Sequence, residues 1–326
     1  MAQMQVADGV HQFKVPMRHN PLGYTYSYYL KEAETLIDAG IPGWDAYSAL
    51  EKQLQEQDTH VKDLERIIIT HMHNDHVGLI EYIRERGAVE TIAHRIAEEH
   101  QQAQIKWYKD MYRNISEELQ LLGGGSFQQF LSRFEHAFRE DPKPLRLDKL
   151  VEDDAALDLP GVKLRVIWTP GHAAEHICLH DAERRILFSG DHVLPKITSH
   201  VSEHTWEKRD PLGDYLNSLI KVRDLPVDLT LPGHEHSFTS LPDRVSQLFK
   251  HHEARLVEVK EALKGGKSTV FDVASAIHWD SRPWLIMDFW TKRMAATETY
   301  AHLVYLRNKS EIREEVIDGV LRYSLA

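Results

Sequence analysis

The feature that most constrains this chain is a short run of metal-binding side chains with the pattern H-x-H-x-D-H, between residues 70 and 78. The run contains four such side chains: His71, His73, Asp75 and His76. An apolar stretch typical of a strand, residues 65–70, precedes the run, and helical spacing resumes over residues 78–86. Imidazoles and a carboxylate crowded into one loop are strained without a cation, whereas a divalent metal satisfies them together. The sequence therefore predicts a metal site in a loop between a strand and a helix.

Three further candidate ligands each follow a predicted strand and stand directly after a glycine. His172 follows W-T-P-G, Asp191 follows F-S-G, and His234 follows L-P-G. Glycine lets the main chain turn sharply, so that the next side chain can point back over the sheet edge. Each of these short motifs is a weak signal alone. In this order after H-x-H-x-D-H, they complete a set of seven candidate ligands.

This set resembles the full dinuclear site of the metallo-β-lactamase superfamily, and the resemblance extends from about Val10 to Ser240. It implies an α/β fold, the αββα sandwich, and two divalent metal ions. Zinc suits a site rich in histidine and carboxylate, while iron or manganese is accommodated in the same frame. By resemblance, the first metal would be held by His71, His73 and His172. The second metal would be held by Asp75, His76 and His234, and Asp191 would bridge both metals. A hydroxide would lie between the metals, and Asp75 would be catalytic by passing the nucleophile's proton to the leaving group.

The remaining pattern predicts short strands interleaved with helices in two successive blocks. The strands are expected at residues 10–15, 25–30, 34–38, 65–70, 163–169, 176–180, 185–189 and 228–231. Two such blocks are typical of two sheets packed face to face with helices outside. A polar, helix-like segment at about residues 95–140 predicts a helical insertion, and its aromatic side chains raise the hypothesis of a lid over the site. We expect a metallo-β-lactamase domain over residues 1–250, including this insertion.

Residues 251–326 have a different pattern, which predicts a second, winged-helix-like domain. Three helices are expected, the second beginning at Thr269 and the third covering residues 297–307, followed by a β-ribbon over residues 317–323. This order resembles the tail of the superfamily branch that contains β-lactamase-like protein 2 and related thioesterase-like hydrolases. From Arg255 onward the tail has 11 basic and 10 acidic residues, which is too little positive charge for reading duplex DNA. It also lacks an equivalent of the basic residues that bind glutathione in glyoxalase II, which disfavours glutathione thioesters.

Several residues near the ligands are candidates for substrate binding. The stretch of residues 193–200, after Asp191, resembles the pocket-lining loop of members with a winged-helix tail. The resemblance implies that His200, His204 and Trp206 face the substrate. His176, four residues after His172, is interpreted as a support for the metal ligands, as a further substrate contact, or as a structural histidine at the start of a strand.

Composition narrows the class of substrate and the surroundings in which the protein works. The net charge of -11 argues against a protein that coats nucleic acid, because phosphate binding needs a basic surface. The single cysteine, Cys178, lies in an apolar run and is expected to be a buried structural thiol. The chain shows no signal-like leader and no apolar stretch of membrane length, so we expect a cytoplasmic protein without a membrane partner. A homodimer through the insertion or the tail is compatible with the sequence.

The leading hypothesis is hydrolysis of a carboxylic thioester, lactone or ester in a small or carrier-bound acyl substrate, by hydroxide attack on the carbonyl. Three alternatives remain open. A dinuclear site serves phosphodiesters equally well, so the enzyme could be a single-strand endoribonuclease or phosphodiesterase, with RNA as its only nucleic-acid substrate. A metal-bound module without turnover is disfavoured by the intact ligand set. Redox chemistry at a di-iron centre is disfavoured because position 73 is histidine where that variant has glutamate.

Overall fold

The computed structural model describes residues 4–18, 20–131, 143–204, 209–280 and 282–326. Its contacts divide the chain into two compact units. The first comprises residues 1–101, 145–199 and 217–245, and the second comprises residues 102–144, 200–216 and 246–326. None of the described helices combines the length and the apolar character needed to span a bilayer.

The first unit contains a seven-stranded sheet in which the strands follow one another in chain order. Its strands are β1 (Met4–Ala7), β2 (Val10–Pro16), β3 (Tyr24–Leu30), β4 (Thr35–Ile37), β5 (Arg66–Ile68), β6 (Glu90–His94) and β7 (Lys149–Val151). The pairs from β1 to β4 are antiparallel, and those from β4 to β7 are parallel. Parallel neighbours need a crossover, which helix α1 (Trp44–Gln55) supplies between β4 and β5. The strands expected at residues 10–15, 25–30 and 34–38 are confirmed, whereas β1, β6 and β7 were not anticipated.

A five-stranded sheet completes the first unit, in the order β12-β11-β10-β9-β8. Its strands are β8 (Ala156–Leu159), β9 (Val162–Trp168), β10 (Ile177–Asp181), β11 (Ile186–Gly190) and β12 (Leu229–Pro232). Strands β11 and β12 are parallel, and helix α7 (Pro211–Arg223) lies between them in the chain. Every residue of β10 and β11 is buried, as expected of strands that are covered on both faces.

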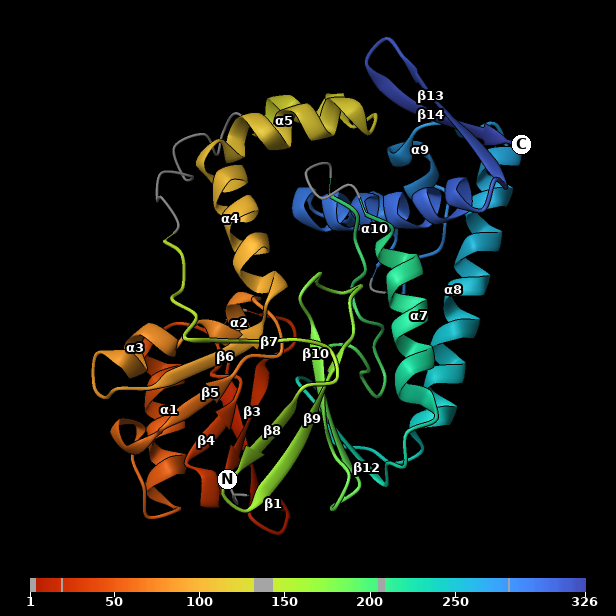
Figure 1. The fold of residues 1–326 in the computed structure, drawn as a ribbon. Helices are drawn as coiled ribbons and strands as arrows, with labels where there is room; N and C mark the ends of the chain where they lie inside the picture. The colour runs from red at the N-terminus through yellow and green to blue at the C-terminus, as the bar shows by residue number, and fades with distance from the viewer. Residues whose placement is uncertain (1–3, 19, 132–142, 205–208, 281) are drawn as a thin grey trace. The chain divides into compact units, whose positions relative to one another are not determined.

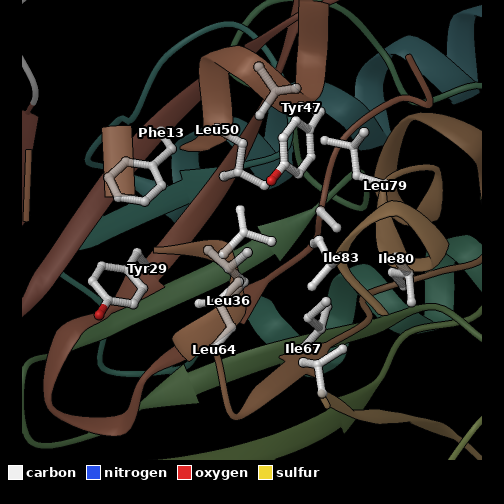
Figure 2. Packing of buried hydrophobic residues seen from close by; sticks show 14 of the residues in the cluster. Phe13, Tyr29, Leu36, Tyr47, Leu50, Leu64, Ile67, Leu79, Ile80 and Ile83 are labelled. Atoms are coloured by element: carbon white, nitrogen blue, oxygen red, sulfur yellow. The ribbon is translucent and has the colours of Figure 1, made fainter. Parts of the chain in front are cut away.

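The two sheets pack face to face, and helices cover the outer face of the seven-stranded sheet (Figure 1). Alternate residues along a strand point to opposite faces, so Ile37 and Ile68 join the core between the sheets, while Leu36 and Ile67 face outward. The outward residues pack against α1 and against α3 (Ile80–Arg84), as Figure 2 shows around Leu50. This arrangement is the expected αββα sandwich.

The second unit is largely helical. It contains most of α4 (Ile96–Lys109), α5 (Met111–Leu121), α6 (Gln128–Leu131), all but the first turn of α8 (Leu241–Lys264), α9 (Val270–Ala274), α10 (Phe289–Asn308) and the hairpin of β13 (Ile312–Ile317) and β14 (Val320–Leu325). The remaining short helices of the chain are α2 (Asn74–Val77) and the 3-10 helices η1 (Lys31–Ala33), η2 (Val61–Asp63), η3 (Gly125–Phe127) and η5 (Trp284–Ile286). Thr269 caps α9 by accepting a hydrogen bond from the Asp272 amide, as expected of a helix beginning there. Helix α10 begins earlier than predicted, because the carboxylate of Asp288 accepts the Thr291 amide and caps it.

One hydrophobic core joins the insertion to the C-terminal segment within this unit. Ile115 and Leu119 of α5 pack with Phe271 of α9 and Leu303 of α10. Four of the five aromatic side chains that suggested a lid are partly buried against this core: Trp107, Tyr112, Phe127 and Phe130. The fifth, Tyr108, is 37% exposed. The lid stays a prediction.

Candidate metal centre

The seven candidate ligands lie in four segments that follow the carboxyl ends of β5, β9, β11 and β12 in the first unit, and two of them, Asp75 and His76, belong to the short helix α2. Within the described residues, three groups of three side chains hold their ligand atoms within 4.8 Å of one another. The groups are His71, His73 and His172; His71, His76 and Asp191; and Asp75, His76 and His234. Together they contain every ligand that the sequence analysis proposed. The loops of four strands therefore converge on one candidate metal centre.

The first group consists of three histidines whose ring nitrogens face a common point. His73 Nδ1 lies 3.0 Å from His71 Nε2 and 3.0 Å from His172 Nε2. Burial lowers the pKa of the His71 imidazole well below its usual value, and the neighbouring histidines lower it further. A neutral imidazole presents a lone pair, which is the form that ligates a metal.

The third group, Asp75, His76 and His234, brings a carboxylate beside two histidines, and Asp191 lies between this group and the first. His234 Nε2 lies 3.3 Å from Asp75 Oδ2 and 3.2 Å from Asp191 Oδ2. The same Asp191 Oδ2 lies 3.7 Å from His172 Nε2, and Asp191 Oδ1 lies 3.6 Å from His76 Nε2. Asp191 thus touches ligands of both groups, which is the position that a bridging carboxylate needs.

The charges at this centre fit divalent cations. His76 Nε2 and Asp191 Oδ1 are buried, and neither has a hydrogen-bond partner among the described atoms. Burial lowers the pKa of His234, but Asp191 and Asp75 outweigh burial and raise it to about 10. Burial raises the pKa of Asp191, but His76 and His234 hold it well below its usual range. The buried carboxylates are therefore stabilised by positive charge beside them. A divalent cation would supply this charge and would be bound by His76 Nε2 and Asp191 Oδ1.

Asp38 supports this centre and was missed by the sequence analysis. Its Oδ1 accepts the Thr70 amide at 2.8 Å, and its Oδ2 accepts the Thr70 hydroxyl at 2.7 Å and lies 2.7 Å from His76 Nδ1. A carboxylate on the far nitrogen of a ligating histidine fixes the tautomer and the direction of the ring. Asp38 is buried and has a φ of 60°, in the left-handed region. The available signal was an acidic residue at the end of the strand predicted over residues 34–38, directly before Ala39-Gly40.

Glu175 and His176, which follow His172 in the chain, support the candidate ligands by accepting main-chain amides of the ligand loops. Glu175 Oε1 accepts the Met72 amide at 2.9 Å, in the middle of H-x-H, and its Oε2 lies 3.1 Å from His100 Nδ1. His176 Nε2 accepts the Asp191 amide at 3.1 Å, and its Nδ1 lies 2.8 Å from the Thr169 hydroxyl. His176 is fully buried, so its contacts are those of a support for Asp191. Of the roles considered for His176, these contacts favour that of a support for the metal ligands.

Two glycines leave the space in which the ligands meet. A Cβ added at Gly233 would lie 2.4 Å from Asp191 Oδ1 and 2.7 Å from His76 Cε1. A Cβ at Gly190 would lie 2.7 Å from His176 Nε2, and the φ of this glycine is +48°. Side chains at these positions would displace a candidate ligand or its support.

The remaining predicted substrate residues lie in the second unit or outside the described residues. His200 Nδ1 lies 3.2 Å from Glu298 Oε2, and His204 Nε2 lies 3.2 Å from Ser202 Oγ. Trp206 lies outside the described residues. Cys178 is buried, and burial raises the pKa of its thiol to about 12, which confirms the prediction of a structural thiol.

Comparison with known proteins agrees with this geometry. Residues 20–234 match the family model of the metallo-beta-lactamase superfamily. The chain is 30% identical to the beta-lactamase-like protein 2 homolog of Caenorhabditis elegans over 276 residues, which cover 82% of this chain and 76% of that protein. It is 28% identical over 254 residues to the probable metallo-hydrolase YqjP of Bacillus subtilis (strain 168), covering 76% of this chain and 77% of that protein.

Solved structures extend the likeness over nearly the whole chain. A metallo-beta-lactamase family protein from Thermus thermophilus is 28% identical and superimposes with a TM-score of 0.80, covering 98% of this chain and 100% of that one. A beta-lactamase domain protein from Burkholderia ambifaria is 25% identical, with a TM-score of 0.80, covering 99% of this chain and 93% of that one. The convergent ligand loops, the sandwich that positions them and these matches give one conclusion: the chain belongs to the metallo-β-lactamase superfamily and has the fold of its metal-dependent hydrolases.

Proposed function

We propose that this protein is a dinuclear metal-dependent hydrolase that cleaves a carboxylic thioester, lactone or ester, and that two bound metals would supply the hydroxide nucleophile. The observation that carries the proposal is the position of Asp191, whose two oxygens lie within 3.7 Å of ligands from both groups. His71, His73 and His172 would hold one cation, and Asp75, His76 and His234 the other. The preponderance of histidine favours zinc.

Bound divalent cations would lower the pKa of a water molecule towards about 7 and polarise the carbonyl of the substrate. The protein's own contribution is to fix the ligands and to move a proton. Asp75 suits the second task, because its side chain is 22% exposed, compared with 10% for that of Asp191. One of its oxygens faces His234, so the other is proposed to receive the nucleophile's proton and pass it to the leaving group. Asp38 and Glu175 keep the ligand loops in place during this transfer.

The experiment that tests the proposal is turnover on a matched panel by protein whose metal content has been measured. The panel contains acyl-CoA and glutathione thioesters, acyl-homoserine lactones, aryl esters, bis-(p-nitrophenyl) phosphate and a labelled single-stranded RNA. We expect an acyl compound to be preferred, and this activity to be lost in Asp191→Ala and strongly reduced in Asp75→Asn. Asp45→Asn is a matched control, because Asp45 is an exposed carboxylate paired with Arg18 in the same unit.

Each contrary result identifies one of the alternatives. Preference for RNA or the phosphodiester would replace the acyl substrate with a nucleic-acid one. Stoichiometric metal without turnover on any compound would favour a binding module. Full activity of an Asp75→Asn protein that keeps its metal would remove the proton relay from the mechanism.

A further inference from the structure

A strained glutamate directly follows the candidate ligand His234. Glu235 has a φ of 71°, in the left-handed region where a residue with a Cβ is disfavoured and glycine is not. A strained residue persists where its surroundings determine its conformation, and such residues concentrate at functional sites. The contacts of Glu235 show which surroundings hold it.

The main chain at this turn is bound to β3. The carbonyl oxygen of Glu235 accepts hydrogen bonds from the hydroxyls of Tyr24 at 2.6 Å and Tyr26 at 3.1 Å. His234 Nδ1 lies 3.0 Å from the Tyr24 carbonyl oxygen, and the Tyr26 amide donates to the Gly233 carbonyl at 2.7 Å. The candidate ligand and the strained residue after it are therefore fixed to the same strand.

The side chain of Glu235 is bound to another loop of the same unit, residues 194–197, which follows Asp191. Its Oε2 accepts the amides of Lys196 at 2.9 Å and Ile197 at 3.1 Å. A carboxylate that accepts two amides makes stronger hydrogen bonds than a neutral acceptor would. Both amides thus depend on one side chain.

Arg244, in the first turn of α8, holds the carbonyl groups of this loop. Its Nε donates to the Leu194 carbonyl at 2.6 Å, and its Nη2 donates to those of Lys196 at 3.0 Å and Ile197 at 2.7 Å. With its main-chain groups bound in this way, the loop leaves Lys196 and Ile197 exposed. The loop starts three residues after Asp191, and its Lys196 and Ile197 amides are bound by the side chain of the residue that follows His234.

We propose that Glu235 is a positioning residue that couples loop 194–197 to the His234 turn, so that Lys196 and Ile197 form a fixed wall for the substrate when His234 is held by a metal. This inference rests on the proposed function for the role of the wall, but the coupling itself does not. The strained conformation is retained because it directs the carboxylate at the two amides while the carbonyl oxygen remains bound to β3. Glycine at position 235 would relieve the strain and lose the connection.

The test compares Glu235→Ala, which loses the acceptor, with Glu235→Gln, which keeps an acceptor oxygen. Glu34→Ala is a matched control, because Glu34 also has a positive φ, 43°, and its Oε2 lies within hydrogen-bond distance of the Tyr29 and Thr59 hydroxyls. The first readout is hydrogen exchange of the Lys196 and Ile197 amides, measured with and without added zinc. In the wild type we expect zinc to slow this exchange.

In Glu235→Ala we expect the exchange of both amides to be about tenfold faster and no longer slowed by zinc, while Glu235→Gln and Glu34→Ala keep the slowing. The second readout is turnover of the preferred substrate, where Glu235→Ala should raise KM about tenfold and leave kcat within about threefold. Persistence of the zinc effect in folded Glu235→Ala would overturn the coupling. An unchanged KM in Glu235→Ala would contradict the role of Lys196 and Ile197 in substrate binding. Equal changes in exchange and KM in Glu34→Ala would show that Glu235 has only a general stabilising role. Absence of any wild-type turnover would contradict the proposed function, while the exchange data would still decide the coupling.

Discussion

Among the described residues, each unit has a largely buried cluster of histidine and acidic side chains, and the two clusters are built differently. The candidate metal centre belongs to the first unit. In the second unit His252 Nδ1 lies 3.1 Å from His302 Nε2, His302 Nδ1 lies 2.8 Å from the Glu298 carbonyl oxygen, and Glu298 Oε2 lies 3.2 Å from His200 Nδ1. By residue type alone, the two clusters would be hard to tell apart.

The arrangement of their ligand atoms separates them. In the second unit the groups form a chain of hydrogen bonds, and burial lowers the pKa of His302 to about 4, so its ring is neutral. In the first unit three groups of side chains hold their ligand atoms within 4.8 Å of one another, and the described residues of the second unit contain no such group. Buried atoms without a hydrogen-bond partner occur in both clusters, at His76 Nε2 and Asp191 Oδ1 and at His252 Nε2. Convergence of the ligand atoms, and not the number of histidines, therefore marks the metal site.

The largest effect should come from removing the central carboxylate of the first cluster. Asp191→Ala leaves both ligand groups without their shared anion, so we expect it to lose at least one metal and more than about 100-fold in activity, beyond the range for an outer partner. Metal content by mass spectrometry checks this, with His302→Gln in the other cluster keeping the wild-type metal content. Normal metal content in Asp191→Ala would contradict the conclusion that the first cluster, and not the second, is the metal site.

A smaller effect is expected from the carboxylate behind His76. Asp38→Asn keeps a residue that tolerates the left-handed region but weakens the hold on the His76 ring, which should lower metal affinity by about 10- to 100-fold. Competition with a chelator measures this affinity. Asp181→Asn is a suitable control, because Asp181 is equally buried but bonded to Arg184. Equal losses in both variants would mean that burial of a carboxylate, and not its contact with His76, matters.

Glu175 should contribute less, because it acts on the main chain of the ligand loop. Glu175→Ala leaves the Met72 amide without its acceptor, and we expect metal affinity to fall about tenfold, with Glu175→Gln recovering most of the loss. Glu183→Gln, at an exposed ion pair with Lys163, provides the control in the same chelator assay. Wild-type affinity in folded Glu175→Ala would show that the loop holds its shape unaided.

The smallest effect should be a pH dependence of stability in the second cluster. The pKa of His302 is about 4 in the folded protein and about 6.5 when unfolded, so between these values the unfolded state binds more protons and stability falls as pH falls. Between pH 7 and pH 5.5 this amounts to about 1 kcal/mol. We expect urea unfolding of His302→Gln to lack this part of the pH dependence. An unchanged slope would assign the acid sensitivity to other groups.

Much of the centre was predictable from sequence because its ligands occur in short motifs directly after strands. All seven, from His71 to His234, are identifiable by residue type and by the glycines before three of them. The residues that support the ligands are not identifiable in this way. Asp38 and Glu175 contact residues 32 and 103 positions away in the chain, and they do so partly through main-chain amides, which the sequence pattern does not reveal. The same limit explains why the packing of Ile115 with α9 and α10 was not foreseen. Such contacts depend on which surfaces the fold brings together.

The empty space at Gly233 has a consequence for recognising active members among related sequences. A single methyl group there would meet Asp191 Oδ1 at 2.4 Å, without changing any of the seven ligands. A related chain with alanine at this position would keep the complete motif set and yet be expected to lose the room its metals need. The seven ligands alone would not distinguish such a chain from a competent one, so the glycine before the last histidine should be inspected together with them.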